Sequence, residues 1–357
     1  MLNFLIMAGG KGERFWPKSR TNTPKQLLNL TGNSTMIQET VERISDIAEP
    51  SHIFIVTNSL YAGPIQQLLP EIPQENIIIE PEGRNTAPCV GLASLVIGSK
   101  DPDGTMVVLA ADHTIKDKHE FCRLLQQGAE IAAKTGGIVT LGIKPDRPET
   151  GYGYIKMGQP HQDFDQAFAV ERFTEKPNFE TTLDFLATGK YLWNSGMFIW
   201  KIATIRRLIQ RFMPDLHHGL EKIGEALGTP AYYEVLRSEF VRFEKISIDY
   251  GIMERAPEVY VLPADIGWDD VGSWNSLERV RRKDSAGNIV IDPNTILVDV
   301  EDCIIESTGE KLVAALGVEN LVYVETPDAV LICPKNRTQD IKLILEKIRA
   351  EKREEYL

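Results

Sequence analysis

The stretch MAGGKGERFWPKSRTNTPKQ, residues 7–26, joins a short apolar run to a loop rich in glycine and positive charge. The apolar run, residues 3–8, is typical of a buried strand. Glycines that follow such a strand let the backbone approach a ligand and direct successive N–H groups at phosphate oxygens. Arg14 and Lys25 add a planar guanidinium and an ammonium group, which together can hold a triphosphate. The stretch therefore predicts a phosphate-binding loop at the end of a strand.

Two other glycine-rich loops do not match this stretch. A Walker A loop needs G-x-x-x-x-G-K-[ST], which is absent. The dinucleotide-binding fingerprint G-x-G-x-x-G fails because Phe15 stands where its third glycine would be. A nicotinamide dehydrogenase is therefore disfavoured. A plain glycine turn, with Lys18 and Arg20 on a solvated basic face, is the alternative interpretation.

The sequence around this loop predicts an α/β fold. Short apolar runs alternate with amphipathic segments, which is typical of a Rossmann-like, mostly parallel sheet covered on both faces. Ligands bind such sheets at the carboxyl ends of the strands. The expected strands are residues 3–8, 53–57, 77–79, 106–111 and 138–142, and the expected helices begin at Thr35 and span 87–98 and 120–134.

The pattern changes in the second half of the chain. Further strands are expected at residues 167–173 and 193–200, with a helix to 212. After residue 285, short strands recur at nearly regular spacing, which predicts a small β-helix-like module closed by a helix at 339–355. The expected short strands are 288–291, 295–298, 303–306, 312–315, 321–324 and 330–332. We therefore predict a catalytic domain, residues 1–284, and a small β module with a terminal helix, residues 285–357.

Composition excludes several classes of protein. The net charge of −12 argues against a nucleic-acid-binding protein, so an anionic ligand must be met by local cations. The four cysteines show no metal or disulfide spacing, which favours reduced thiols and a cytoplasmic location. The apolar N-terminal run is too short for a signal peptide or a transmembrane helix, so we expect no membrane association.

Several motifs resemble those of the sugar-phosphate nucleotidyltransferase family. The first is the loop itself, G-x-G-x-R followed by FWPxSR and PKQ. The others are residues 80–88 (EPEGRNTAP), 108–113 (VLAADH), 173–177 (FTEKP), 193–198 (WNSGMF), 247–254 (SIDYGIME) and 267–274 (GWDDVGSW). Their order along about the first 280 residues is most similar to the mannose-1-phosphate guanylyltransferases, also called GDP-mannose pyrophosphorylases. Many bacterial relatives add a C-terminal isomerase domain. Because this chain ends at residue 357, we expect no isomerase activity.

The resemblance implies a set of site residues. It assigns Mg²⁺ to Asp112 and Asp270, and disfavours Asp269. Carboxylates with phosphate oxygens suit Mg²⁺, although an aspartate after a strand is also often a helix cap. The implied catalytic residues are Arg14, Lys25 and Lys176. The implied nucleotide-binding residues are Ala8, Gly9, Gly10, Gly12, Gly83, Asn85 and Thr86. The implied sugar-phosphate-binding residues are Gly153, Glu175, Lys176, Asn194 and Asp249.

Some of these residues have a structural alternative. Asn85 and Thr86 are expected to pair with the edge of a guanine base, or else only to cap the following helix. Glu175 and Lys176 are expected to hold sugar hydroxyls and the sugar phosphate, or else to form a surface ion pair. Beside Asp112, His113 is expected to have a structural role.

The resemblance implies GMP transfer from GTP to mannose 1-phosphate, giving GDP-mannose and pyrophosphate by in-line attack on the α-phosphorus. Another hexose 1-phosphate or nucleoside triphosphate remains an alternative. So does a non-catalytic, sugar-nucleotide-binding regulatory relative, which would be expected to have lost a metal carboxylate or a phosphate clamp. The expected partners are GTP, mannose 1-phosphate and a second copy of the chain, since the β module suggests a homodimer.

Overall fold

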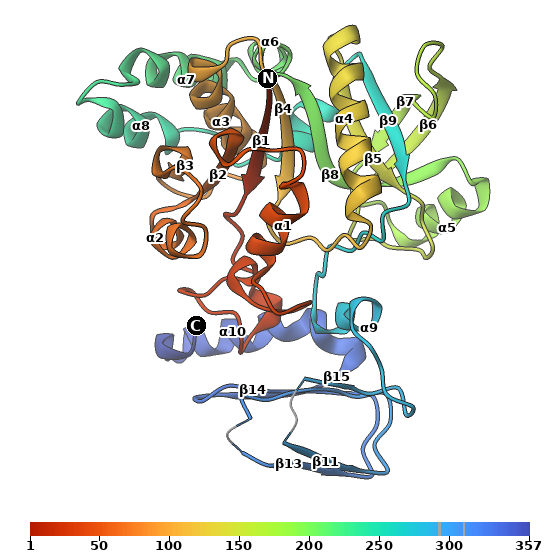
Figure 1. Cartoon of the computed structure of the whole chain (residues 1–357). Coiled ribbons are helices and arrows are strands. Elements are labelled where there is room, and N and C mark those ends of the chain that lie inside the picture. Colours follow the sequence, from red (N-terminus) through yellow and green to blue (C-terminus); the bar gives the residue numbers. More distant parts are fainter. Residues whose placement is uncertain (292–293, 310) are drawn as a thin grey trace. The chain divides into compact units, whose positions relative to one another are not determined.

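The computed structural model describes residues 1–291, 294–309 and 311–357 (Figure 1). The chain forms two compact units. The first unit comprises residues 1–9, 41–110 and 115–268, and the second comprises residues 10–40, 111–114 and 269–357. The single boundary predicted near residue 284 differs from this division, because residues 10–40 and 269–284 group with the C-terminal module.

The first unit is built on one mixed sheet. Its strands run in the order β3-β2-β1-β4-β8-β5-β9-β7-β6. Neighbours among the first four strands pair in parallel, as β9 does with β5, whereas β8 runs antiparallel between β4 and β5. The strands are β1 (Leu2–Met7), β2 (Ile53–Asn58), β3 (Ile77–Glu80), β4 (Thr105–Ala110), β5 (Ile138–Ile143), β6 (Tyr154–Pro160), β7 (Phe168–Thr174), β8 (Tyr191–Lys201) and β9 (Val259–Ala264). The predicted α/β fold is confirmed, but the sheet is mixed rather than mostly parallel, because β8 and β7 pair antiparallel with each of their neighbours. Strand β9 was not predicted.

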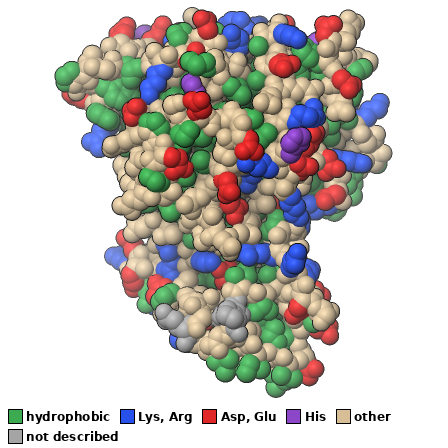
Figure 2. Space-filling view, in the orientation of Figure 1, with side chains coloured by type: hydrophobic (Ala, Val, Ile, Leu, Met, Phe, Trp, Pro, Cys, Tyr) green, Lys and Arg blue, Asp and Glu red, His purple; other side chains and the backbone are tan. Residues whose placement is uncertain are grey.

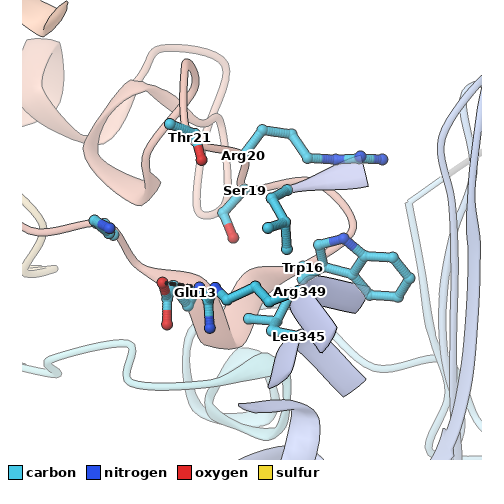
Figure 3. A pocket seen from close by; sticks show the side chains of 9 residues that line it. Glu13, Trp16, Ser19, Arg20, Thr21, Leu345 and Arg349 are labelled. Carbon is cyan, nitrogen blue, oxygen red and sulfur yellow. Dashed lines mark hydrogen bonds and ion pairs between the residues drawn. The ribbon is translucent and has the colours of Figure 1, made fainter. Parts of the chain in front are cut away.

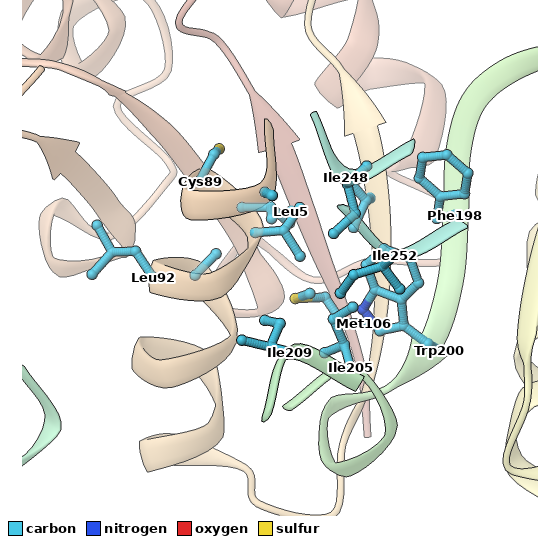
Figure 4. Close-up of a cluster of buried hydrophobic side chains, with 14 of the residues drawn as sticks. Leu5, Cys89, Leu92, Met106, Phe198, Trp200, Ile205, Ile209, Ile248 and Ile252 are labelled. Atoms are coloured by element: carbon cyan, nitrogen blue, oxygen red, sulfur yellow. The ribbon is translucent and has the colours of Figure 1, made fainter. Parts of the chain in front are cut away.

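Helices cover both faces of this sheet. In β1, Phe4, Leu5 and Ile6 are all fully buried, although neighbouring residues of a strand point to opposite faces. Figure 4 shows Leu5 and Met106 packed with residues of α3 and α6 on one face. Helix α4 packs against β5 and β8. The helices are α2 (Ser59–Leu68), α3 (Thr86–Lys100), α4 (Lys118–Thr135), α5 (Phe179–Thr188), α6 (Ile202–Phe212), α7 (Pro214–Ala226) and α8 (Tyr232–Phe240).

Helix α1 (Met36–Ile44) begins where the sequence predicted. The Thr35 backbone N–H donates to Gln38 Oε1 at 3.1 Å, and the Gln38 N–H donates to Thr35 Oγ1 at 3.4 Å. This reciprocal pair is the capping box expected from the three-residue spacing.

The second unit contains the predicted β-helix-like module. Strands β10 (Ile289–Val290), β12 (Ile304–Glu306) and β14 (Leu321–Glu325) pair in parallel, and β15 (Val330–Pro334) joins β14 antiparallel. Strands β11 (Thr295–Val298) and β13 (Val313–Leu316) form a separate parallel pair. Strands β10 to β14 thus alternate between two sheets, as in the coils of a β-helix. The unit also holds α9 (Leu277–Val280) and α10 (Ile341–Ala350), which is shorter than the predicted helix 339–355.

The core of the second unit joins the glycine-rich loop to this module. Phe15 and Trp16 belong to one buried cluster with Trp274 and with Ile304 of β12. The rings of Phe15 and Trp274 meet edge to face at 5.2 Å. The indole N–H of Trp274 donates to the Trp16 carbonyl at 3.1 Å, and the indole N–H of Trp16 donates to the Tyr356 carbonyl at 2.7 Å. The loop is therefore held by residues that follow it by more than 250 positions.

Two general expectations concern the cysteines and the membrane. All four cysteines are free thiols, as expected from their spacing. No helix within the described ranges combines the length and the apolar character needed to cross a membrane.

Replacement of Trp274 by Ala is expected to destabilise the protein by about 3–5 kcal/mol, because the side chain is fully buried. The measurement is urea unfolding followed by circular dichroism. Tyr233→Ala is the control, since Tyr233 is 74% exposed and its loss should change the free energy of unfolding by only about 0.5 kcal/mol. Equal losses in the two variants would contradict the assignment of Trp274 to the core.

Candidate active site

Lys25 lies at the centre of the candidate site in the second unit. Its Nζ donates to Asp112 Oδ2 at 2.9 Å and to the backbone carbonyl of Asp270 at 2.6 Å. The lysine is only 5% exposed, so its charge depends on these oxygens for compensation. One ammonium group thus links two aspartates that are separated by 158 positions in sequence.

The electrostatic environment keeps Asp112 ionised. Burial acts to raise the pKa of its carboxyl, but the charge and hydrogen bond of the Lys25 ammonium, with His113 and a backbone hydrogen bond, outweigh this effect, so the pKa lies below its ordinary value. A carboxylate that stays charged at neutral pH can bind a cation or orient one.

A pocket of about 530 Å³ surrounds this pair. It is lined by Lys11, Gly12, Glu13, Arg14, Phe15, Lys25, Asp112, His113, Asp270, Gly272, Gln339 and Lys342. The Arg14 guanidinium donates to the Gly272 carbonyl at 3.2 Å. The structure therefore brings five predicted residues to one pocket, namely Gly12, Arg14, Lys25, Asp112 and Asp270. The size of the pocket and its cations suit a polyphosphate.

Gly12 is required by the position of Lys25. Its φ is +63°, in the left-handed region that glycine adopts readily. A Cβ at this position would lie 2.1 Å from the Lys25 Cβ and 3.0 Å from its backbone nitrogen. Any larger residue would displace the lysine, which explains a glycine at this point of the loop.

A short bridge positions the two aspartates. Thr114 and Asp269 exchange backbone hydrogen bonds at 2.8 and 2.9 Å, next to Asp112 and Asp270 respectively. The Asp269 carboxylate is buried, pairs with Arg279 and accepts the Val271 N–H at 2.8 Å. Asp269 therefore has a structural role, and the expectation that Asp270 rather than Asp269 faces a ligand stays a prediction.

The residues of this pocket fit a magnesium ion. Within the described ranges no group of three or more His, Cys, Asp or Glu side chains could hold a metal by itself. Mg²⁺ commonly takes only one or two carboxylates and completes its shell with phosphate oxygens and water. Asp112 and Asp270 provide such a pair in a pocket that also presents cations.

The predicted sugar-phosphate residues gather in the first unit. Asn194 Nδ2 donates to Asp249 Oδ1 at 2.8 Å, and Lys176 Nζ lies 2.9 Å from Glu175 Oε1. A Cβ on Gly153 would lie 2.4 Å from Glu175 Oε2, so the glycine makes room for that carboxylate. The hydrogen bond to Glu175 raises the pKa of Lys176, which keeps its ammonium charged. The side chains of Glu175, Asn194 and Asp249 thus form a polar cluster beside the exposed ammonium group of Lys176.

The environment of Asp249 in this cluster disfavours the ionised form of its carboxyl. Burial and the negative charge of Glu175 raise the pKa of its carboxyl to about 6, although the hydrogen bond from Asn194 opposes the rise. Such a shift is typical of a residue kept for function at the expense of stability.

The structure places the expected base-binding residues at the start of α3. Asn85 Oδ1 accepts the Thr86 N–H at 2.8 Å, and Thr86 Oγ1 accepts the Ile248 N–H at 2.8 Å. The Asn85 oxygen therefore caps α3, whereas the Thr86 hydroxyl holds the distant segment at Ile248, and the role of both residues toward a base stays a prediction. Gly83 is exposed in the preceding loop. In the glycine-rich loop, Ala8 and Gly9 belong to the first unit, whereas Gly10 and Gly12 belong to the second.

The neighbouring Glu80, at the end of β3, was not singled out from the sequence. Burial raises the pKa of its carboxyl to about 7, against a hydrogen bond from Cys89 that opposes the rise, and its Oε1 is buried without a hydrogen-bond partner. Its place as the first residue of the EPEGRNTAP motif was the available signal.

Gln339 and Lys342 line the pocket around Lys25 and were also missed. Nothing in the sequence indicates that the C-terminal segment reaches that pocket.

Comparison with known proteins agrees with this geometry. The family described as nucleotidyl transferase matches residues 3–287, and the MannoseP isomerase/GMP-like beta-helix domain matches residues 293–348. The chain belongs to the nucleotidyl transferase family. The resemblance seen in the sequence motifs is thereby confirmed, as is the β-helix character of the C-terminal module.

Individual relatives cover nearly the whole chain. The mannose-1-phosphate guanylyltransferase of Salmonella montevideo is 40% identical over 100% of this chain and 76% of its own length. That of Escherichia coli (strain K12) is 40% identical over 99% of this chain and 74% of its own length. Among solved structures, mannose-1-phosphate geranyltransferase from Thermus thermophilus superposes with a TM-score of 0.87 at 32% identity, covering 98% of this chain and 99% of the other.

Replacement of Asp249 by Asn is expected to stabilise the protein at high pH. The carboxyl has a pKa of about 6 in the folded chain, above its ordinary value of 3.8. The protonated carboxyl is therefore favoured by folding, so its stabilising contribution is full below pH 3.8 and is lost as the pH rises to about 6. The variant avoids this loss, and its free energy of unfolding should exceed that of the wild type by about 1–2 kcal/mol at pH 8 and by less at pH 4.5.

Urea unfolding at both pH values measures this difference. The control variant is Asp103→Asn, which makes the same substitution at an exposed position. A difference between Asp249→Asn and the wild type that stays constant from pH 4.5 to pH 8 would contradict the electrostatic explanation.

Proposed function

We propose that the protein transfers GMP from GTP to mannose 1-phosphate, producing GDP-mannose and pyrophosphate. The observation that carries this proposal is the pocket in which Lys25 joins Asp112 to Asp270 beside Arg14. Such a pocket suits a nucleoside triphosphate, and the named relatives from Salmonella montevideo and Escherichia coli are mannose-1-phosphate guanylyltransferases.

The reaction needs no strong general base. A phosphate oxygen of the sugar attacks the α-phosphorus of GTP as the bond from this phosphorus to the bridging oxygen of the β-phosphate breaks. The new P–O bond completes GDP-mannose, and the electron pair of the broken bond leaves with pyrophosphate. Because the attacking oxygen is already ionised at neutral pH, catalysis consists of positioning and of stabilising charge.

The residues divide these tasks. Arg14 and Lys25 stabilise the charge that grows on pyrophosphate, and Lys176 holds the phosphate of the sugar. Glu175 and Asp249 accept hydrogen bonds from sugar hydroxyls. Asp112 and Asp270 would hold Mg²⁺, which when bound neutralises phosphate charge.

Pyrophosphate release tests the proposal. The protein is incubated with Mg²⁺, each of the common nucleoside triphosphates and each hexose 1-phosphate. GTP with mannose 1-phosphate should give the largest kcat/KM. A larger value for another pair would reassign the substrates within the same reaction, and no release with any pair would favour a non-catalytic sugar-nucleotide-binding protein.

The proposal extends to the assembly of the chain. On the β11–β13 pair, Ile296, Val298 and Leu316 are exposed, and Val298 lies beside Leu316 in the strand register. Figure 2 shows hydrophobic side chains gathered in the part of the view where Figure 1 draws these strands. An exposed apolar patch of this kind is typical of a protein interface. Sedimentation should therefore give the mass of a homodimer, and a monomer at micromolar concentration would count against it.

A cytoplasmic location completes the proposal. Its support is the set of four free cysteines, which is usual for a reducing compartment. Cell fractionation would test it, and recovery from another compartment would argue against it.

Replacement of Asp270 by Asn or Lys25 by Ala is expected to lower kcat about 10²–10³-fold, as loss of one preorganised electrostatic group commonly does. The measurement is steady-state pyrophosphate release, with the melting temperature recorded to separate loss of fold from loss of chemistry. Lys347→Ala offers a matched control because Lys347 is an exposed lysine that does not line the pocket. Full activity in both site variants would refute the assignments.

A further inference from the structure

We propose that Lys342, from the C-terminal helix α10, binds the pyrophosphate portion of the nucleotide. The inference rests on the proposed function of the pocket and extends it to a residue outside the motifs discussed above. It makes the β-helix module a direct participant in substrate binding.

The position of Lys342 is the first argument. Lys342 and Gln339 line the same pocket as Arg14, Lys25 and Asp270. Lys342 is exposed and makes no ion pair with any residue in the ranges 1–291, 294–309 and 311–357. Its charge is therefore available to an anion in the pocket, whereas Lys25 already contacts Asp112.

The attachment of α10 is the second argument. Ile341 and Leu345 are 1% and 2% exposed and belong to the same buried cluster as Phe15 and Trp16. Figure 3 shows Leu345 beside Trp16, and the side chains of Glu13 and Arg349 directed toward one another. The Arg349 guanidinium donates to Glu13 Oε1 at 2.7 Å. The helix is thus fixed to the loop that carries the first phosphate-binding residues.

Helix geometry connects these contacts to Lys342. Residues seven positions apart lie on nearly the same face of an α-helix, about 10 Å apart along its axis. Arg349 contacts Glu13, so Lys342 lies on the same face two turns earlier, where the pocket also includes Arg14. Because α10 is anchored in the core, the backbone that carries Lys342 is already fixed before an anion binds.

The chemistry of the pocket favours the pyrophosphate portion as the ligand. A triphosphate carries its largest charge on the terminal phosphates, and pyrophosphate gains charge as it leaves. A lysine acts on phosphate as a point charge with three donors, and the Gln339 amide can add a neutral donor. We therefore expect Lys342 to affect binding of GTP and pyrophosphate but not of mannose 1-phosphate.

The test uses the full chain and three variants, Lys342→Ala, Lys342→Arg and Lys347→Ala. Lys347 is an exposed lysine of the same helix that does not line the pocket, which makes it a matched control. Binding of inorganic pyrophosphate and of GTP is measured by calorimetry, alongside KM for mannose 1-phosphate. Lys342→Ala should weaken pyrophosphate and GTP binding about tenfold, Lys342→Arg should restore most of it, and Lys347→Ala should match the wild type.

The outcomes separate this inference from the proposed function. Equal pyrophosphate binding by Lys342→Ala and the wild type would overturn the inference, even if the wild type makes GDP-mannose. An equal loss in Lys347→Ala would also overturn it, because the effect would then come from the general charge of the helix. If the wild type binds pyrophosphate through Lys342 but uses other substrates, the inference stands and the proposed function fails.

Discussion

The contact of the Lys25 ammonium with the Asp112 carboxylate and the Asp270 carbonyl is the constraint on which the site depends. A buried lysine is costly unless its charge is paired and its donors are satisfied. The chain meets this need with oxygens from two distant segments, which a backbone bridge between Thr114 and Asp269 holds side by side. Gly12 then leaves the space that the lysine occupies. The hydrogen bonds that compensate the buried Lys25 thus also bring together the residues of the phosphate pocket.

The same unit explains why the β-helix module accompanies the glycine-rich loop. Such a loop has few side chains with which to build a core of its own, so Phe15 and Trp16 pack into the core of the module. Charged contacts reinforce the attachment, because Lys18 pairs with the buried Glu306, and Arg20 lies 2.7 Å from Asp328. In the first unit, by contrast, Asp249 is held near like charge at a cost to stability. The contacts of the second unit fix the glycine-rich loop, whereas the first unit retains a carboxylate, that of Asp249, that lowers stability.

The sequence predicted local features well and long-range pairing poorly. The buried strands and the capping box at Thr35 depend on neighbouring residues, and both were predicted. The antiparallel insertion of β8 and the strand β9 were not, because the partners of a strand are not encoded in its own periodicity. Gln339 and Lys342 were missed for the same reason, since only the packing of α10 and of the turn before it brings them to the pocket. Motifs predicted the aspartates through family resemblance, while the second role of Thr86, accepting the Ile248 N–H, needed the structure.

A crystal structure of the protein with GTP and Mn²⁺, located by its anomalous signal, tests the central claim most directly. The account predicts phosphate oxygens within hydrogen-bonding distance of Lys25 and Arg14, and the metal ion bound to Asp112 and Asp270. A triphosphate bound away from this pocket, or a metal ion held by other residues, would contradict it.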